Sequence, residues 1–254
     1  MAMPHYLTAQ VVSIEPLKEY VRLAIKAEPI AKEMRPGQFA MLSLGCEPLL
    51  PRPFSIAMEE RGVLYFVFQS LGKGTARLAS LRPGDSVKIL GPLGRAFSEV
   101  TDMRPVIVAG GRGIAPFFEL VRRLQRCAPV LFYGGRTQGQ IVETGFFARR
   151  THEMVVTTED GSMGTKGLIT EPIAAYLSDH RPPIVYACGP HALLHKVADL
   201  AGDIRTELSM EANMACGFGI CMGCAIPAGE AGFKRVCVDG PIFSSRDIRW
   251  KDLK

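Results

Sequence analysis

The stretch that decides the fold is PVIVAGGRGIAP, residues 105–116. Its first five residues are apolar, which is typical of a strand buried on both faces of a parallel sheet. Gly110, Gly111 and Gly113 then allow the backbone to turn and to approach a pyrophosphate, and Pro116 suits the first turn of a helix. The stretch therefore predicts a strand, turn and helix that bind a nucleotide.

Downstream, apolar runs alternate with helix-like segments. The expected strands are 130–133, 154–158 and 184–187, and the expected helices are 116–126, 170–177 and 191–201. This alternation predicts a βαβ domain with a parallel sheet over residues 100–210. Turn residues end three of these strands, at 133–137, 158–162 and 188–190, as expected for a nucleotide crevice at the carboxyl edge of the sheet.

Upstream, the pattern is of short β-like runs separated by Gly, Pro and charged residues. The runs are 6–14, 20–27, 38–44, 54–58, 63–69 and 86–90, with one brief helical stretch at 75–81. Such spacing predicts a small antiparallel barrel. The fold class is therefore α/β plus all-β, with a barrel over residues 1–99, the βαβ domain over 100–210 and a cysteine-rich module over 211–254.

Composition narrows the function classes. The 254 residues are 47% hydrophobic and 22% charged, which argues against a disordered or fibrous protein. A net charge of +5 comes from scattered basic residues, so neither nucleic acid nor a membrane is an expected partner. With neither a secretory signal nor a long apolar run, we expect a cytoplasmic protein whose seven cysteines do not form a disulfide framework.

Four cysteines lie close together near the end of the chain. Cys216, Cys221, Cys224 and Cys237 have the spacing Cys-x4-Cys-x2-Cys-x12-Cys, whose opening part matches the [2Fe–2S] loop of plant-type ferredoxins. Such a cluster needs four thiolates, two for each iron. A structural zinc site and unligated cysteines are the alternatives. Two other cysteines, Cys46 and Cys127, lie in apolar contexts and read as inert thiols.

Two short motifs in the predicted barrel suggest an anionic ligand. In the first, Arg52-Pro53-Phe54-Ser55, the guanidinium suits a phosphate and the hydroxyl suits a ring. In the second, Gly72-Lys73-Gly74-Thr75, a helix start offers free N–H groups to an anion. A solvent-exposed turn with an N-cap Thr is the alternative for the second motif.

Together these motifs resemble the ferredoxin reductase superfamily, whose barrel binds FAD. The resemblance implies that Arg52 contacts the flavin diphosphate, with Pro53, Phe54 and Ser55 beside the flavin and Ser55 near its isoalloxazine. It also implies that Gly72, Gly74 and Thr75 cradle the diphosphate. The superfamily's glycine turn, Gly-Gly-x-Gly-x-x-Pro, matches residues 110–116, although relatives often carry Gly where this chain has Arg112.

The same resemblance places the nicotinamide beside Cys188 and Gly189, and the adenine ribose near the strand that carries Thr158. Carboxylates there accept a hydrogen bond from a ribose 2′-hydroxyl but repel a 2′-phosphate. Glu159 and Asp160 therefore favour NADH over NADPH. No residue is assigned as certainly catalytic, and Ser55 and Cys188 are the candidates nearest the flavin and the nicotinamide.

Over essentially its whole length the chain resembles the electron-transfer subunits of dihydroorotate dehydrogenase B, notably in SMEANMACG (209–217) and CVDGPIF (237–243). The resemblance implies electron flow from NADH through FAD and [2Fe–2S] to the FMN of a separate catalytic subunit in pyrimidine biosynthesis, within a hetero-oligomer. The alternatives are a flavin and iron–sulfur subunit of an NAD(P)H-ferredoxin reductase, sulfide dehydrogenase or hydrogenase complex, and a zinc-stabilised nucleotide-sensing module. For Glu211, a loop carboxylate and a cluster contact are equally open, and His191 reads as a surface or capping residue.

Overall fold

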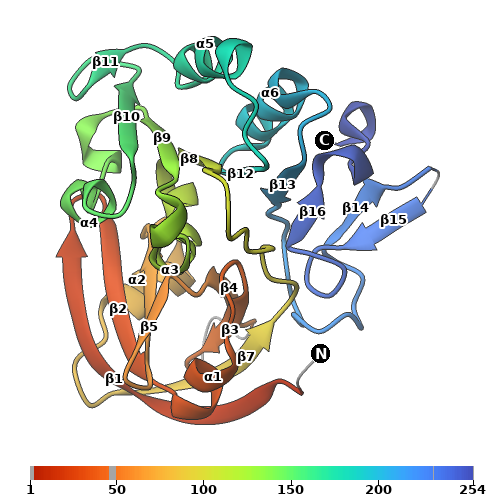
Figure 1. Cartoon of the computed structure of the whole chain (residues 1–254). Helices are drawn as coiled ribbons and strands as arrows, with labels where there is room; N and C mark the ends of the chain where they lie inside the picture. Colours follow the sequence, from red (N-terminus) through yellow and green to blue (C-terminus); the bar gives the residue numbers. More distant parts are fainter. Residues whose placement is uncertain (1–2, 46–49, 231, 254) are drawn as a thin grey trace.

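The computed structural model describes residues 3–45, 50–230 and 232–253, so Cys46 lies outside the described residues. Two seven-stranded sheets dominate the fold, an antiparallel one from the N-terminal part and a mainly parallel one from the middle (Figure 1). Within the described part of the chain, every helix is too short or too polar to cross a bilayer.

The N-terminal sheet has the order β4-β3-β7-β1-β2-β6-β5, and each neighbouring pair is antiparallel. It is a half-barrel with edge strands β4 and β5, and its alternating sequence buries residues such as Leu23 and Ile25 in its core. The strand β4 starts at Arg52, earlier than expected, because an edge strand tolerates Pro53. The elements are β1 (His5–Leu17), β2 (Tyr20–Lys26), α1 (Glu28–Glu33), β3 (Phe39–Ser43), β4 (Arg52–Ser55), β5 (Met58–Glu60), β6 (Val63–Phe68), α2 (Lys73–Ala79) and β7 (Ser86–Leu93).

The second sheet has the order β11-β10-β9-β8-β12-β13-β16 and is parallel from β11 to β13. Its central strand β8 is buried on both faces, as its apolar sequence predicts, with Ile107 in one core cluster and Val106 and Val108 in the other. The elements are β8 (Val106–Gly110), η1 (Gly111–Ile114), α3 (Phe117–Arg123), η2 (Gln125–Cys127), β9 (Val130–Gly135), η3 (Gln138–Gln140), α4 (Thr144–Ala148), β10 (Glu153–Thr158), β11 (Thr165–Lys166), α5 (Thr170–Asp179), β12 (Val185–Cys188), α6 (His191–Ala201) and β13 (Thr206–Ser209).

The C-terminal segment contains more regular structure than its sequence suggests. Strands β14 (Ala225–Ala228) and β15 (Gly232–Arg235) form a hairpin beside the second sheet (Figure 1). The strand β16 (Ile242–Ser244) pairs antiparallel with β13 and so extends the second sheet, before two short turns, η4 (Ser245–Asp247) and η5 (Trp250–Asp252). The last strand of the second sheet therefore comes from beyond the cysteines.

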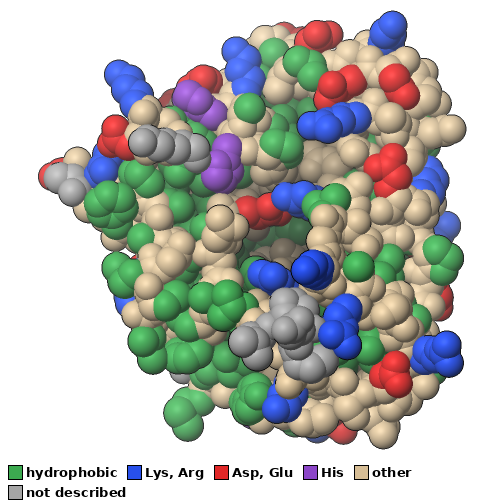
Figure 2. Space-filling view, turned by 180° about the vertical axis from the view of Figure 1, so that it is seen from behind, with side chains coloured by type: hydrophobic (Ala, Val, Ile, Leu, Met, Phe, Trp, Pro, Cys, Tyr) green, Lys and Arg blue, Asp and Glu red, His purple; other side chains and the backbone are tan. Residues whose placement is uncertain are grey.

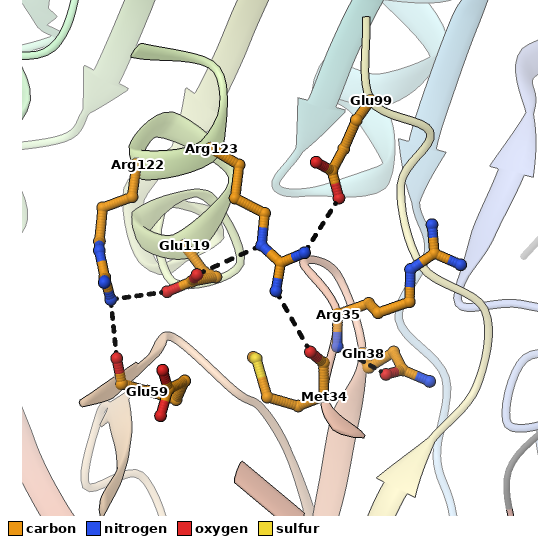
Figure 3. A network of polar contacts seen from close by, with 8 residues as sticks. All are labelled: Met34, Arg35, Gln38, Glu59, Glu99, Glu119, Arg122 and Arg123. Atoms are coloured by element: carbon orange, nitrogen blue, oxygen red, sulfur yellow. Dashed lines mark hydrogen bonds and ion pairs between the residues drawn. The ribbon is translucent and has the colours of Figure 1, made fainter. Parts of the chain in front are cut away.

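Helix α3 joins the two sheets. The backbone N–H of Glu119 donates to the carbonyl of Ala57 at 2.9 Å. Arg122 donates to the carbonyl of Glu59 at 2.7 Å (Figure 3). The Glu119 carboxylate, whose residue is 5% exposed, accepts from Arg122 at 2.9 Å and from Arg123 at 3.3 Å. Because α3 follows the glycine turn and Ala57 follows β4, this joint fixes the two predicted ligand sites relative to one another.

Candidate functional site

A cavity of about 890 Å³ lies at the carboxyl ends of the parallel strands. The face in Figure 2 is hollowed near its centre, with acidic and basic side chains along the rim of the hollow. The cavity is lined at each strand end by residues of the turn that follows, as the sequence predicts for a nucleotide crevice. Of the residues proposed from sequence, the lining includes Gly110, Gly111, Glu159 and Gly189.

The glycine turn is built by close backbone contact. A Cβ atom on Gly113 would lie 2.2 Å from the carbonyl oxygen of Cys188, so no larger residue fits without movement. Gly111 has a φ of +52°, in the left-handed region that favours glycine. The structure thus brings the turn after β8 against Cys188 and Gly189 at the end of β12. The Cys188 thiol is buried, which raises its pKa to about 12, so it is neutral at physiological pH.

The two carboxylates after β10 have different surroundings. Glu159 lines the cavity, whereas Asp160 accepts hydrogen bonds from the backbone N–H and the hydroxyl of Ser162, at 2.9 and 2.6 Å. These bonds lower the pKa of Asp160 and hold the turn. The basic residues of the same lining are Arg112, Arg136 and Lys196. Arg136 lies in the expected turn 133–137, whereas sequence reasoning missed Lys196. Glu159 is therefore the carboxylate of this pair that lines the cavity.

Arg112 and Glu211, both unexplained in the sequence, form an ion pair at 3.0 Å. Both side chains are half exposed and both residues line the cavity. The ring Nε2 of His191 lies 3.2 Å from the backbone carbonyl of Glu211. The segment that leads to the cysteines is thus held at the rim of the nucleotide cavity. Neither expectation for Glu211, a loop carboxylate or a cluster contact, included this ion pair.

The N-terminal part of the chain also lines the cavity, with Tyr20 of β2 and with Gln69 and Leu71, which follow β6. Tyr20 of β2 is 2% exposed, and its hydroxyl lies 3.4 Å from the carbonyl of Gln140, which also lines the cavity. Glu19 accepts a hydrogen bond from the hydroxyl of Thr137 at 2.9 Å. Residues more than a hundred positions apart share no local pattern, so sequence reasoning could not find this contact.

The residues expected to meet a flavin lie on β4 and at the start of α2. Arg52, Pro53, Phe54 and Ser55 are all half-buried, and the ring of Phe54 packs against Phe68, the last residue of β6, at 5.0 Å between centroids. The chain then runs from β6 to Gly72, the N-cap of α2. This ring contact brings the edge strand β4 towards the loop that precedes α2.

Thr75 of the motif Gly72-Lys73-Gly74-Thr75 makes hydrogen bonds within its own loop. Its hydroxyl accepts from the backbone N–H groups of Leu71 at 2.9 Å and Gly72 at 3.0 Å, and it lies 3.0 Å from the carbonyl of Gly72. Gly72 is exposed, with no atom within 4 Å of the position that its Cβ would take, and Gly74 is buried in the first turn of α2. Thr75 therefore shapes the loop and engages the backbone of Gly72, while the space beside Gly72 where a side chain would lie stays open.

The four clustered cysteines form two pairs. The Sγ atoms of Cys224 and Cys237 lie 3.2 Å apart, and both residues are buried. Cys221 is exposed and donates hydrogen bonds to Cys216. In the described residues, no three His, Cys, Asp or Glu side chains converge as the ligands of a single metal ion. Two pairs of thiols fit a cluster that takes two thiolates for each of two irons.

The surroundings shift the pKa values of Cys216 and Cys237 in opposite directions. Burial opposes ionisation of Cys216, but hydrogen bonds from the backbone of Cys221, Phe218 and Ile220 outweigh it and lower the pKa of this thiol to about 6. Burial and the neighbouring Cys224 raise the pKa of Cys237 to about 12 in the absence of metal. A donor set of this kind suits thiolate ligation.

Two family models match the chain. Residues 107–199 match the oxidoreductase NAD-binding domain. Residues 211–249 match the iron-sulfur cluster binding domain of dihydroorotate dehydrogenase B. The first match covers the sheet that forms the cavity and the second covers all four paired cysteines.

Whole-chain comparisons agree. The chain is 36% identical over 237 residues to the dihydroorotate dehydrogenase B (NAD(+)) electron transfer subunit of Desulforamulus reducens, covering 89% of this chain and 90% of that one. It is 35% identical to the corresponding subunit of Caldanaerobacter subterraneus, covering 85% of this chain and 88% of that one. A solved structure of an NADH-dependent reduced ferredoxin–NADP oxidoreductase, described for flavin-based electron bifurcation, superimposes with a TM-score of 0.86 at 26% identity, over 96% of this chain and 91% of that one. The chain belongs to the family of dihydroorotate dehydrogenase B electron transfer subunits.

Proposed function

We propose that this chain takes hydride from NADH onto FAD and passes single electrons through a [2Fe–2S] cluster to the FMN of a dihydroorotate dehydrogenase catalytic subunit, in pyrimidine biosynthesis. The observation that carries this proposal is the pairing of four cysteines on a chain that also holds a dinucleotide cavity, in a sequence 36% identical to such a subunit. FAD supplies the conversion of two-electron hydride transfer into one-electron steps.

Different residues of this chain bind different parts of NADH. Gly110, Gly111 and Gly113 let the backbone approach the pyrophosphate of the dinucleotide. Glu159 accepts a hydrogen bond from the ribose 2′-hydroxyl and repels a 2′-phosphate, so NADH is the expected donor. Cys188 and Gly189 lie beside the nicotinamide ring of the dinucleotide. The neutral Cys188 thiol adds no charge there.

The flavin is held by the N-terminal half-barrel in this proposal. Arg52 binds the diphosphate with its guanidinium, and Ser55 lies near the isoalloxazine. The missing side chain of Gly72 leaves room for the diphosphate, and the N–H group of Gly74, in the first turn of α2, donates to it. Phe54 provides an apolar wall in place of a hydroxyl contact. The exposed side of Gly72 supports this assignment.

The cluster is held by Cys216 with Cys221 on one iron and Cys224 with Cys237 on the other. We divide the chain into a flavin domain (1–99), an NADH domain (100–210) and a cluster module (211–254). The pairing of β16 with β13 ties that module to the NADH domain. This chain has no recognised segment left for an orotate site, so we expect an incomplete enzyme that works in a cytoplasmic hetero-oligomer.

A second candidate keeps the chemistry and changes the partner. The likeness to the NADH-dependent reduced ferredoxin–NADP oxidoreductase extends over 96% of this chain with a TM-score of 0.86. A flavin and iron–sulfur subunit of a ferredoxin reductase complex would show the same cavity and the same paired cysteines. The partner therefore decides between the two.

Mixing experiments distinguish these partners. The purified chain is combined anaerobically either with an FMN-containing dihydroorotate dehydrogenase subunit or with ferredoxin, and NADH oxidation is followed. We expect NADH-dependent reduction of orotate only in the first mixture. If the chain alone oxidised dihydroorotate, the subunit assignment would be wrong, and if only ferredoxin accepted electrons, the second candidate would replace the first.

A further inference from the structure

We propose that Met41 is a positioning residue that sets the separation between the flavin site and the iron–sulfur cluster, through its contact with Gly217. This inference rests on the proposed function. Gly217 directly follows Cys216 and has a φ of +81°. A Cβ atom there would lie 2.5 Å from Cγ and 2.8 Å from Sδ of Met41. The backbone beside the first cluster cysteine therefore rests on the Met41 side chain, in a space that only glycine fits.

Met41 connects this contact to the flavin strand. It lies on β3, where its register partner is Pro53 of the Arg52–Ser55 strand. Met41 is 2% exposed and belongs to the core cluster that contains Cys224 and Cys237, whereas its neighbour Leu42 belongs to the core of the half-barrel. A single strand, β3, thus separates the flavin motif from the cysteine loop, which we define as residues 216–224.

Other contacts hold the segment around the cysteines against the same side of the half-barrel. Leu93 of β7 lies 3.4 Å from the position that a Gly217 Cβ would take. The backbone N–H of Arg95 donates to the carbonyl of Gly240 at 2.6 Å. A Cβ on Gly94 would lie 2.4 Å from Cδ of Pro241. The cysteine-bearing segment is therefore packed on β3 and β7, and its distance from the flavin strand follows from that packing.

Electron transfer between two cofactors slows steeply as their separation grows. A cavity at Met41 would let the cysteine loop shift, whereas a residue of equal bulk would hold it in place. The NADH cavity lies at the strand ends of the other sheet and would be untouched. Met41 should therefore control the step from flavin to cluster and leave the step from NADH to flavin unchanged.

The test compares Met41→Ala, Met41→Leu and the matched control Leu42→Ala, whose side chain faces the other core. Anaerobic stopped-flow mixing with NADH resolves flavin bleaching from cluster reduction, and iron content and the EPR spectrum of the dithionite-reduced protein report on the cluster itself. We expect Met41→Ala to slow cluster reduction about tenfold with normal iron content, normal flavin bleaching and an altered EPR line shape. Met41→Leu should restore the rate, and Leu42→Ala should leave it within about twofold of the wild type.

A second pair of variants guards against a merely structural effect. Gly217→Ala should slow cluster reduction because its Cβ meets Met41, and the double variant Met41→Ala/Gly217→Ala should recover part of that loss, since the smaller side chain makes room. The inference is overturned if Met41→Ala leaves cluster reduction unchanged, if it slows flavin bleaching equally, or if the double variant shows no recovery. A wild-type chain without iron, or with a flavin that NADH does not bleach, would instead contradict the proposed function.

Discussion

The dinucleotide cavity and the cysteine loop are built in opposite ways. The cavity is shaped by backbone in close contact, as at Gly113 against Cys188. The cysteine loop is exposed to solvent, with Ile220 75% exposed. Met222 in this loop has a φ of +59°, a backbone angle that residues other than glycine rarely adopt. The comparison teaches that the positions of glycines in the sequence determine the nucleotide site, whereas the spacing of cysteines determines the cluster site.

The largest expected effect comes from removing one sulfur of the buried pair. Cys224→Ser should abolish the cluster, because an iron loses a thiolate, and should leave FAD bound and reducible by NADH. Iron and labile-sulfide assays, with the flavin spectrum, measure both outcomes. Cys127→Ser, far from the loop in sequence, is the control. Loss of flavin together with iron in a folded protein would show that the two sites are not separate.

Next in size is the effect of filling the glycine turn. Gly113→Ala places a Cβ 2.2 Å from the Cys188 carbonyl, so the turn must move and NADH-dependent flavin bleaching should fall about 100-fold. Dithionite should still reduce both cofactors. Gly145→Ala is the control, since the nearest atom to its Cβ is the end of the Arg149 side chain at 3.4 Å. Unchanged bleaching in Gly113→Ala would contradict a backbone-built site.

The joint between the sheets should show a moderate effect. Glu119→Ala removes a buried carboxylate and leaves Arg122 and Arg123, each about a third exposed, without their shared partner. We expect a loss of about 2 kcal/mol in the free energy of unfolding, below the cost of breaking a fully buried pair because the arginines reach water. Urea unfolding measures it, with the more exposed Glu99→Ala as the comparison. Equal effects of the two variants would argue against a special role for the joint.

The smallest expected effect concerns the choice of donor. Glu159→Gln removes the charge that repels a 2′-phosphate, so the preference for NADH over NADPH should weaken about fivefold. Asp160→Asn should change this ratio less, because its carboxylate is engaged by Ser162. The ratio of flavin-bleaching rates with the two donors reports the effect. An unchanged ratio in Glu159→Gln would place the ribose elsewhere.

Local sequence patterns predicted much of the fold. The parallel strands and the antiparallel strands were predictable, because periodicity and spacing are properties of short stretches. The barrel expected from those antiparallel strands is a half-barrel, and the family came from the resemblance of the motifs. Strand β8 matches its prediction to within one residue at each end. The four cysteines that the spacing indicated lie in two pairs in the structure, and which cysteines pair was not predicted.

What the sequence could not show is contact between distant segments. The ion pair of Arg112 with Glu211 joins two residues that were separately unexplained, and Tyr20 reaches the cavity from the other sheet. The β14 and β15 hairpin was missed because its four-residue strands leave little room for a periodic pattern. In each case the signal lies in tertiary packing, which no single stretch records.

One measurement tests the central claim that two unlike sites serve one electron path. The purified chain is titrated anaerobically with NADH while flavin absorbance and the EPR signal of a reduced [2Fe–2S] cluster are recorded in the wild type and in Gly113→Ala. We predict that NADH bleaches the flavin and produces the cluster signal in the wild type. In Gly113→Ala both responses should be slowed together, about 100-fold, although dithionite still produces them at the normal rate. A cluster signal that NADH produces in Gly113→Ala while the flavin stays oxidised would contradict the account.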